Sequence, residues 1–260
     1  MHQPLSYVDA GANIARNVVI EPFVTIEKNV TIGSGTWIGS NVTIMEGATI
    51  GENCRIFPGA VISAIPQDLK FGGEESEVII GDNTTIRECV TINRGTKITG
   101  KTIIGNDCLL MAYCHIAHDC YIGNNCVIVN SVALGGHITI GNWVIIGGLS
   151  AIHQFVHIGD HAMISGGALV RKDVPPFVKA AREPLSFVGI NSIGLRRRGF
   201  KDKKIHEIQN IYRILFQSNK NTTQAISKIE AELPVSPERD TILSFIHNSG
   251  RGIMKGYMQN

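Results

Sequence analysis

The strongest pattern in this chain is an aliphatic residue at every sixth position. From Val8 to Val170, 26 of the 28 positions in this frame are Ile, Leu or Val, and only Asp68 and Glu74 depart from it. The fourth residue after most frame positions is also small or branched. An α-helix, with about 3.6 residues per turn, would spread residues at this spacing over all of its faces. A fixed period of six is instead typical of a hexapeptide-repeat parallel β-helix.

Three hexads make one triangular coil of about 18 residues, so residues that far apart should stack on successive coils, about 4.8 Å apart as in a sheet. We expect the frame residue and its fourth neighbour to point inward, and the other four to form corners or point outward. Five of the six cysteines, all but Cys89, take the inward position. This predicts buried, reduced thiols acting as small core residues, not a disulfide framework or a zinc site.

The 260-residue chain has a formal charge of +2 and 43% hydrophobic residues, enough for a large core. Its N-terminus shows no basic start followed by an apolar run, and the repeat already begins at Val8. We therefore expect a cytoplasmic protein without a signal peptide, a membrane span or a separate N-terminal domain. We also expect no nucleic-acid partner and no stable membrane insertion.

Residues 63–77 interrupt the repeat but leave its frame unchanged, so they replace whole hexads. Pro66 and the pair Gly72 and Gly73 are typical of a loop. Loops in a uniform solenoid usually lie on its binding face, and we expect this one to project there; a tolerated surface insertion is the alternative. A shorter irregularity at residues 99–101 is less informative.

Histidines are concentrated between residues 115 and 161, which hold six of the nine in the chain. Three of them follow frame positions that are one coil apart and should meet at one corner of consecutive coils: His118, His137 and His153. His115 and Asp119 extend the cluster. It could bind zinc through three histidines, or provide one imidazole as a general base near neutral pH. A zinc site would need a closely spaced pair from adjoining faces, such as H-x4-H, and the chain has no H-x4-H pair here, which favours the general base.

After Val170 the repeat ends, and residues 177–195 are interpreted as a connection. Apolar residues at three- and four-residue spacing then predict a helix beyond Phe200, a second over 222–233, and a third that starts at Ser236 and ends before Gly250. We expect a β-helix domain over 1–190 and a helical domain over 191–260. Six of the nine residues at 196–204 are basic, an unfavourable charge for a helix start, which predicts an acidic partner or phosphate.

A set of short motifs is similar to those of the bacterial acyl-carrier-protein–UDP-N-acetylglucosamine O-acyltransferases, the family that catalyses the first step of lipid A synthesis. The motifs are QDLK at 67–70, TINRGT at 91–96, HIAHDC at 115–120, GGH at 135–137, HQF at 153–155, DVPPF at 173–177 and GLRRRGF at 194–200. The resemblance covers nearly the whole chain. It implies a mainly β fold, a left-handed parallel β-helix with a C-terminal α-helical domain, and a homotrimer with active sites between subunits.

The resemblance also implies the reaction and the residues that perform it. A long (R)-3-hydroxyacyl group, carried on the phosphopantetheine of acyl carrier protein, would pass to UDP-N-acetylglucosamine without a further cofactor or a metal. His118 is similar to the general base, Asp119 to its orienting partner, and the backbone N–H of Gly136 to the oxyanion donor. Positions similar to substrate contacts are Asp68, Lys70, His115, His137, His153, Gln154, Asn191, Arg197 and Arg198. Gly166 matches the position that sets acyl length, where glycine leaves the groove open.

Two positions depart from the family pattern: Asn93 stands where some members carry histidine, and Ile193 where several carry glutamate. They change the expected uridine contacts, and the acceptor group at the 3-position could be a hydroxyl or an amine. An acetyl-CoA-dependent sugar acetyltransferase and a metal-dependent hydratase are the enzyme alternatives. The N-acyltransferase of the same pathway would carry an additional N-terminal domain. An ice-binding β-helix would show paired threonine rows, which this chain lacks.

Overall fold

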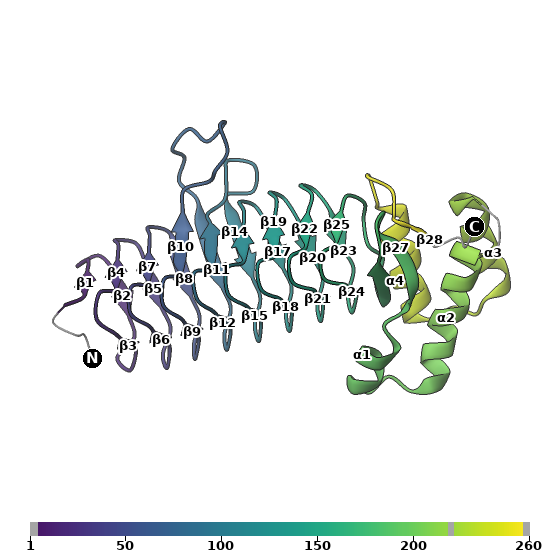
Figure 1. Cartoon of the computed structure of the whole chain (residues 1–260), viewed down its shortest axis with the longest axis horizontal. Coiled ribbons are helices and arrows are strands. Elements are labelled where there is room, and N and C mark those ends of the chain that lie inside the picture. Colours follow the sequence, from purple (N-terminus) through teal and green to yellow (C-terminus); the bar gives the residue numbers. More distant parts are fainter. Residues whose placement is uncertain (1–4, 218–220, 257–260) are drawn as a thin grey trace.

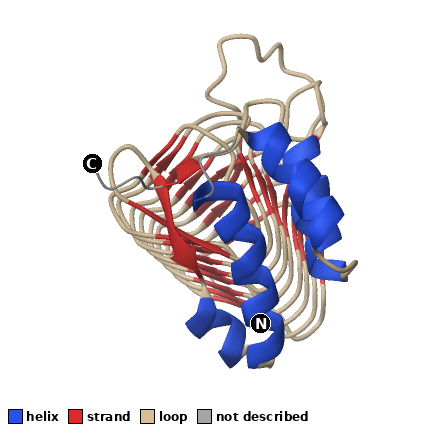
Figure 2. Cartoon of the chain, turned by 90° about the vertical axis from the view of Figure 1, so that its right-hand side faces the viewer, coloured by secondary structure: helices blue, strands red, loops and turns tan. Residues whose placement is uncertain are grey.

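The structure is a computed structural model that describes residues 5–217 and 221–256. Within these residues, short strands stack into a rod and helices gather at its C-terminal end (Figure 1). Figure 2 looks along the rod from that end, with the coils one behind another. Thr25 pairs with Thr43 and Ile26 with Ile44 in parallel, so each residue lies beside the one that is three hexads further along the chain. The triangular coil of three hexads is therefore confirmed.

Over the described ranges the strands form three sheets that run the length of the rod. The first sheet contains β1 (Tyr7–Val8), β4 (Thr25–Ile26), β7 (Thr43–Ile44), β10 (Val61–Ala64), β13 (Thr91–Asn93), β16 (His115–Ile116), β19 (Ala133–Leu134), β22 (Ala151–Ile152) and β25 (Leu169–Val170). The second contains β2 (Asn13–Ile14), β5 (Thr31–Ile32), β8 (Ala48–Ile50), β11 (Glu77–Ile80), β14 (Lys101–Ile104), β17 (Tyr121–Ile122), β20 (Thr139–Ile140) and β23 (His157–Ile158). The third contains β3 (Val19–Ile20), β6 (Trp37–Ile38), β9 (Arg55–Ile56), β12 (Thr85–Ile86), β15 (Leu109–Leu110), β18 (Val127–Ile128), β21 (Ile145–Ile146), β24 (Met163–Ile164), β26 (Val178–Ala181), β27 (Ser186–Ile190) and β28 (Lys255–Gly256).

The interior of the rod is filled by the two inward positions of each hexad, as predicted. Frame residues such as Ile26 and Ile116 are fully buried, and so are their fourth neighbours Val30 and Cys120. The five inward cysteines are buried free thiols, whereas Cys89 is exposed. Because every coil adds aliphatic side chains to one continuous column, the hydrophobic effect stabilises the stack coil by coil.

Two insertions interrupt the stack. Ile50 pairs with Ile80, whereas an uninterrupted repeat would pair it with Asp68, so the first insertion adds two hexads. Ile92 pairs with Ile116 in place of Leu110, so the second insertion adds one hexad. We call residues 65–76 the long loop, which projects from the rod in Figure 1, and residues 94–100 the short loop. The short loop corrects the repeat assignment, because Ile98 lies in the six-residue frame but is 67% exposed.

Corners join the sheets, and three sets of corner residues near the C-terminal half of the rod are used below. Corner I joins the first sheet to the second and includes residues 117–120, 135–138 and 153–156. Corner II joins the second sheet to the third and includes residues 123–126, 141–144 and 159–162. Corner III joins the third sheet to the first and includes residues 129–132, 147–150 and 165–168.

The C-terminal part contains α1 (Ser192–Arg197), α2 (Asp202–Gln217), α3 (Thr222–Glu232) and α4 (Pro237–His247). The three expected helices, α2 to α4, are confirmed, and Ser236 caps α4 by accepting a hydrogen bond from the backbone N–H of Arg239. Tyr212 of α2 is buried and donates its hydroxyl to the carbonyl of Pro176, at 2.5 Å, which fixes α2 to the end of the rod.

The interpretation of residues 177–195 as a plain connection is wrong. They form β26 and β27, an antiparallel pair that extends the third sheet, and they lead into α1. The charge argument for this region needs correction in part. Arg196 and Arg197 occupy the last turn of α1, where the helix dipole favours cations. Lys203 and Lys204 do lie in the first turn of α2, as predicted, but Asp202 precedes them there. Within the described residues, no helix has the length and apolar character that crossing a bilayer requires.

Candidate active site

Corner I brings His118, Asp119 and His137 into direct contact. Nδ1 of His118 lies 2.8 Å from Oδ2 of Asp119, and Nε2 of His137 lies 3.6 Å from the same oxygen. The two imidazole rings meet edge to face with centroids 5.0 Å apart. His137 also stacks on Phe155, with ring centroids 4.7 Å apart. The predicted meeting of His118 and His137 on consecutive coils is therefore confirmed.

The repeat itself produces this geometry. Asp119, His137 and Phe155 occupy one place on three successive coils, with φ values of 58°, 59° and 66°. Aspartate and histidine are among the non-glycine residues that adopt positive φ more readily. His118 and Gly136 occupy the preceding place, so their columns run side by side along corner I.

The carboxylate of Asp119 is fully buried and held by the short loop. The backbone N–H groups of Thr96 and Thr99 donate to Oδ1 at 3.0 and 3.3 Å. The Thr96 hydroxyl donates to Oδ2 at 2.7 Å, and the Thr99 hydroxyl donates to Oδ1. Burial alone would raise the pKa of Asp119, but hydrogen bonds from Thr99, His118 and Thr96 outweigh it and lower the pKa below its ordinary value. The side chain is thus a carboxylate at neutral pH.

An ionised Asp119 determines the tautomer of His118. Because Oδ2 accepts a hydrogen bond, Nδ1 of His118 carries the proton and Nε2 keeps its lone pair. Gly136 lies against this ring, because a Cβ atom at 136 would come within 2.5 Å of Cε1 and 2.7 Å of Nε2 of His118. Glycine at 136 therefore leaves the basic nitrogen open to a substrate. His118 itself is 7% exposed, so the outward corner position does not leave it on the surface.

The two neighbouring histidines are neutral at pH 7. Burial, followed by the charge of His118, lowers the pKa of His115, whose Nδ1 lies 2.8 Å from the Thr91 hydroxyl. Burial also lowers the pKa of His137, with opposing effects from Asp119 and Asp68 and a further lowering from His118. These rings can donate or accept hydrogen bonds without adding a positive charge beside His118.

The long loop reaches this corner from the side. The charge of Asp68 acts on His137, and its carboxylate accepts a hydrogen bond from the backbone N–H of Lys70 at 3.0 Å. The buried amide of Asn93 donates to the carbonyl of Ile65 at 3.0 Å. Asn93, a departure from the family pattern, thus anchors the start of the loop that carries Asp68.

The remaining predicted residues lie farther from His118. His153 is at corner I, but its Nδ1 lies 3.0 Å from the carbonyl of Gln154 and 3.2 Å from Nη2 of Arg251, so it does not join the pair of rings as predicted. Gly166 is exposed at corner III. Arg197 and Ile193 are exposed on α1.

Asn191 and Arg198 lie at corner II around His161. Nδ2 of Asn191 donates to the carbonyl of His161 at 2.9 Å, and Nη1 of Arg198 lies 3.2 Å from its Nδ1. The guanidinium group also sits over the ring of Trp143, 5.2 Å from the centroid. Burial and the charge of Arg198 lower the pKa of His161 to about 4, so a neutral imidazole accepts the hydrogen bond. Sequence reasoning missed His161, Phe155 and both threonines of the short loop.

The three groups of corner I also have the arrangement of a possible metal site. His118, Asp119 and His137 offer ligand atoms within 4.8 Å of one another. Both oxygens of Asp119, however, already accept hydrogen bonds from Thr96, Thr99 and His118. A metal ion would have to replace these bonds, so the arrangement favours a histidine base over a metal centre.

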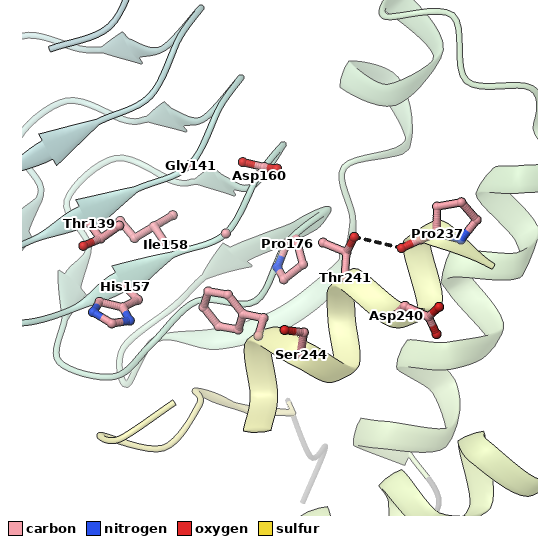
Figure 3. Close-up of a pocket in the computed structure, with 12 residues that line it drawn as sticks. Thr139, Gly141, His157, Ile158, Asp160, Pro176, Pro237, Asp240, Thr241 and Ser244 are labelled. Atoms are coloured by element: carbon pink, nitrogen blue, oxygen red, sulfur yellow. Dashed lines mark hydrogen bonds between the residues drawn. The ribbon is translucent and has the colours of Figure 1, made fainter. Parts of the chain in front are cut away.

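A cavity of about 550 Å³ lies apart from this site, between the end of the second sheet and α4 (Figure 3). Its wall includes His157 and Asp160 from the coils and Asp240, Thr241 and Ser244 from α4. The hydroxyl of Thr241 is engaged with the carbonyl of Pro237 at 2.8 Å. None of the residues predicted for the active site lines this cavity.

Comparison with known proteins gives consistent matches along the chain. Residues 173–254 match the family described as UDP N-acetylglucosamine O-acyltransferase, domain 2, and residues 29–64 and 101–136 match the bacterial transferase hexapeptide repeat. An acyl-[acyl-carrier-protein]–UDP-N-acetylglucosamine O-acyltransferase of Myxococcus xanthus is 46% identical over 195 residues, 75% of this chain and 76% of the relative. The enzyme of the same name from Chlorobium phaeobacteroides is 49% identical over 193 residues, 74% of this chain and 73% of the relative.

Solved structures agree over the full length. A UDP-N-acetylglucosamine acyltransferase from Bacteroides fragilis superimposes with a TM-score of 0.97 at 52% identity, covering 98% of this chain and all of that one. A homologous structure from Acinetobacter baumannii gives 0.94 at 40% identity, covering 98% and 99%. The parallel pairing, the hexapeptide matches and these structures agree on a left-handed parallel β-helix with C-terminal helices, as expected. The chain belongs to the family of acyl-[acyl-carrier-protein]–UDP-N-acetylglucosamine O-acyltransferases.

Proposed function

We propose that this protein transfers a long-chain (R)-3-hydroxyacyl group from acyl carrier protein to the 3-position of UDP-N-acetylglucosamine, the first step of lipid A biosynthesis. The observation that carries the proposal is the buried His118–Asp119 pair, packed against Gly136 on the next coil, in a chain of this family. The names of the relatives support the donor and the acceptor.

The geometry supports a direct transfer. Nε2 of His118 takes the proton of the sugar 3-hydroxyl, or of an amine there, as the oxygen or nitrogen attacks the thioester carbonyl. Asp119 stabilises the imidazolium that forms, because its carboxylate is already ionised and in contact with Nδ1. The tetrahedral intermediate then expels the phosphopantetheine thiolate, which receives the proton from His118. The N–H of Gly136, beside His118, is the proposed oxyanion donor.

Substrate binding is assigned to residues around this centre and to a second set on other parts of the chain. Asp68 and Lys70 on the long loop and His115, His137, His153 and Gln154 at corner I would hold the sugar and the pantetheine arm. Asn191, Arg197 and Arg198 would hold the nucleotide, its phosphates or the donor. Gly166 would leave room for the far end of a long acyl chain. Apart from the donor's phosphopantetheine, the proposal needs no cofactor.

A homotrimer would bring these residues together. In one chain, His118 lies at corner I, Arg198 at corner II and Gly166 at corner III, so the faces of the prism separate them. A second copy packed alongside would place its corners II and III against corner I of the first. Exposed apolar side chains at corner III support such packing, since Tyr113 is 66% and Leu149 75% exposed in the single chain.

The acidic partner and the compartment follow from the same proposal. Arg197, Lys201 and Lys203 are exposed between the end of α1 and the start of α2, where an acidic carrier protein could dock.

The five buried cysteines are free thiols, which fits a reducing compartment, and we propose the cytoplasm.

The test is a reconstituted reaction read by mass spectrometry. Purified protein is incubated with a panel of 3-hydroxyacyl-carrier proteins of different lengths and with UDP-N-acetylglucosamine or its 3-amino analogue. We expect an acylated sugar nucleotide and free carrier thiol, formed with one acceptor in preference to the other. Acetyl-CoA is the competing donor. Turnover with acetyl-CoA and none with acyl carrier protein would replace the proposal with the sugar acetyltransferase.

A further inference from the structure

The short loop is the only described segment besides corner I that contacts the Asp119 carboxylate. Thr96 and Thr99 together supply two backbone and two hydroxyl donors. Thr96 is buried and its hydroxyl binds Oδ2, the oxygen that also contacts His118. The orientation of Asp119 therefore depends on an insertion as well as on the coils that carry His118 and His137.

Glu74 connects this insertion to the long loop. One carboxylate oxygen accepts a hydrogen bond from the backbone N–H of Lys97 at 3.0 Å, and the other from that of Gly72 at 2.8 Å. Lys97 directly follows Thr96. Hydrogen bonds from its own backbone N–H and from those of Lys97 and Gly72 lower the pKa of Glu74, so it is a carboxylate at neutral pH. A single side chain thus fastens the loop that carries Asp68 to the loop that holds Asp119.

We propose that Thr96 and Thr99 are positioning residues that act on the acyl transfer through Asp119, and that Glu74 keeps the short loop in place for them. The proposal rests on the proposed function for the role of His118 as base. Its structural part, that the threonines act through Asp119, can be tested without activity. The two insertions then serve as a support for the catalytic pair, in addition to carrying residues that touch substrate.

The physical reason is that a buried carboxylate stays ionised and correctly rotated only while hydrogen bonds replace water. Loss of the Thr99 or Thr96 hydroxyl removes one hydrogen-bond donor from Oδ1 or Oδ2, respectively. The carboxylate can then rotate away from Nδ1 of His118. The titratable groups that face Asp119 are His118 and His137 at corner I. His115 on the first sheet interacts with His118, and Asp68 on the long loop interacts with His137, so both affect Asp119 only indirectly. None of these can donate to Oδ1 in place of a threonine without moving.

The experiment is a double-mutant cycle on the full-length protein. Thr96→Val and Thr99→Val each remove a hydroxyl at nearly constant volume, and Thr96→Ser and Thr99→Ser retain it. We expect each valine variant to lose kcat by about ten- to a hundredfold, the range for one hydrogen bond to a charged group, with the acceptor KM unchanged. Each serine variant should recover most of the loss. In an Asp119→Asn background, the valine substitutions should change kcat by less than about twofold.

Glu74→Ala is expected to reduce kcat about threefold, because solvent competes for its hydrogen bonds, and this loss should also disappear in the Asp119→Asn background. Glu75→Ala and the exposed Thr31→Val are the matched controls and should behave as wild type. Full losses that persist in the Asp119→Asn background would overturn the proposal, because the loops would then act by another route. So would a loss confined to the acceptor KM.

Thermal unfolding separates this result from a failure of the proposed function. Thr96→Val should lower Tm in the wild-type background and much less in the Asp119→Asn background, whatever reaction the protein performs. If wild type shows no acyl transfer but this coupling of Tm is present, the function is wrong and the support for Asp119 stands. If Tm falls equally in both backgrounds, the threonines do not act through Asp119.

Discussion

Gly136 lies one coil above His118 and leaves no space for a side chain: a Cβ atom at 136 would come within 2.5 Å of Cε1 and 2.7 Å of Nε2 of His118. The φ of Gly136 is not among the positive values, so the requirement for glycine comes from the approach to the imidazole and not from the backbone. The base and the proposed oxyanion donor are therefore held together by the stacking of two coils.

Gly136→Ala should keep the fold and lose activity. The added methyl group must displace the ring of His118, which breaks its alignment with Asp119 and covers Nε2. We expect kcat to fall by at least about a hundredfold, the size of a lost base or oxyanion contribution. Circular dichroism and Tm check the fold. Gly135→Ala is a poor control, because its Cβ would meet the backbone of Gln154, so the exposed Gly250→Ala serves instead.

His118→Ala tests the base directly. We expect a loss of about 10²–10⁴-fold in kcat/KM, because proton removal from the acceptor would depend on water. The change also leaves a small cavity beside Asp119, so a lower Tm is expected together with an unchanged oligomeric state. Added zinc or a chelator should leave the wild-type rate unaltered. Wild-type turnover by the variant would remove His118 from the mechanism.

The six-residue period predicted the coil, the inward cysteines and the contact between His118 and His137, because stacking is fixed once residues three hexads apart are known to align. It failed at Ile98 for a physical reason. An insertion with the length of one hexad leaves the frame unchanged, so a projecting residue occupies an apparent core position. The support of Asp119 by Thr96 and Thr99 was missed with it, since the contact depends on how that insertion folds back.

The C-terminal half shows a different limit of the sequence pattern. Helices α2 to α4 follow from apolar spacing and from the cap at Ser236, which are local signals. The pairing of β26 with β27 and the contact of Arg198 with His161 depend on where the chain returns to the rod. Such contacts join residues far apart in sequence, and periodicity carries no information about them.

His161 predicts a dependence of stability on pH. Its pKa is lowered from 6.5 to about 4 in the folded protein, so between these values the unfolded chain binds more protons. The free energy of unfolding should therefore decrease as pH falls from 6.5 toward 4. His161→Gln should remove part of this decrease and also weaken the interaction with the Arg198 guanidinium group. Urea unfolding at a series of pH values gives the slope, with His206→Gln as the control for loss of a histidine.

The basic segment predicts that the KM for acyl carrier protein depends on the salt concentration. Reversing the charge of Lys201 and Lys203 to glutamate should raise the KM for acyl carrier protein and leave the KM for the sugar nucleotide unchanged. Added salt should raise the donor KM of wild type, because exposed charges are screened within about 8–10 Å at 0.1–0.15 M. An acyl-phosphopantetheine donor without the protein should show little of this dependence, and Arg16→Glu at the far end of the rod is the charge control. A donor KM that does not change with added salt would indicate that the segment is an ordinary solvated surface.

Gly166 is the test of acyl length. It is exposed at corner III and stacks on Gly148, whose carbonyl oxygen would lie 3.1 Å from a Cβ at 166, so two successive coils lack side chains here. A long acyl chain buried along such a surface gains about 0.8 kcal/mol per methylene. Gly166→Met should fill the far end of the groove. Accommodating a long donor should then cost about 1–3 kcal/mol more in the free energy that determines kcat/KM, as in an overpacked core.

The comparison is kcat/KM for a long donor and for one several carbons shorter, on wild type and on Gly166→Met. We expect the long donor to lose about ten- to a hundredfold, from that energy range, and the short donor to lose little. Ser165→Met, on the same corner but one place earlier, controls for added bulk. Equal losses for both donors would indicate damage to corner III as a whole. An unchanged preference for the long donor would mean that the acyl chain follows another path across the subunit.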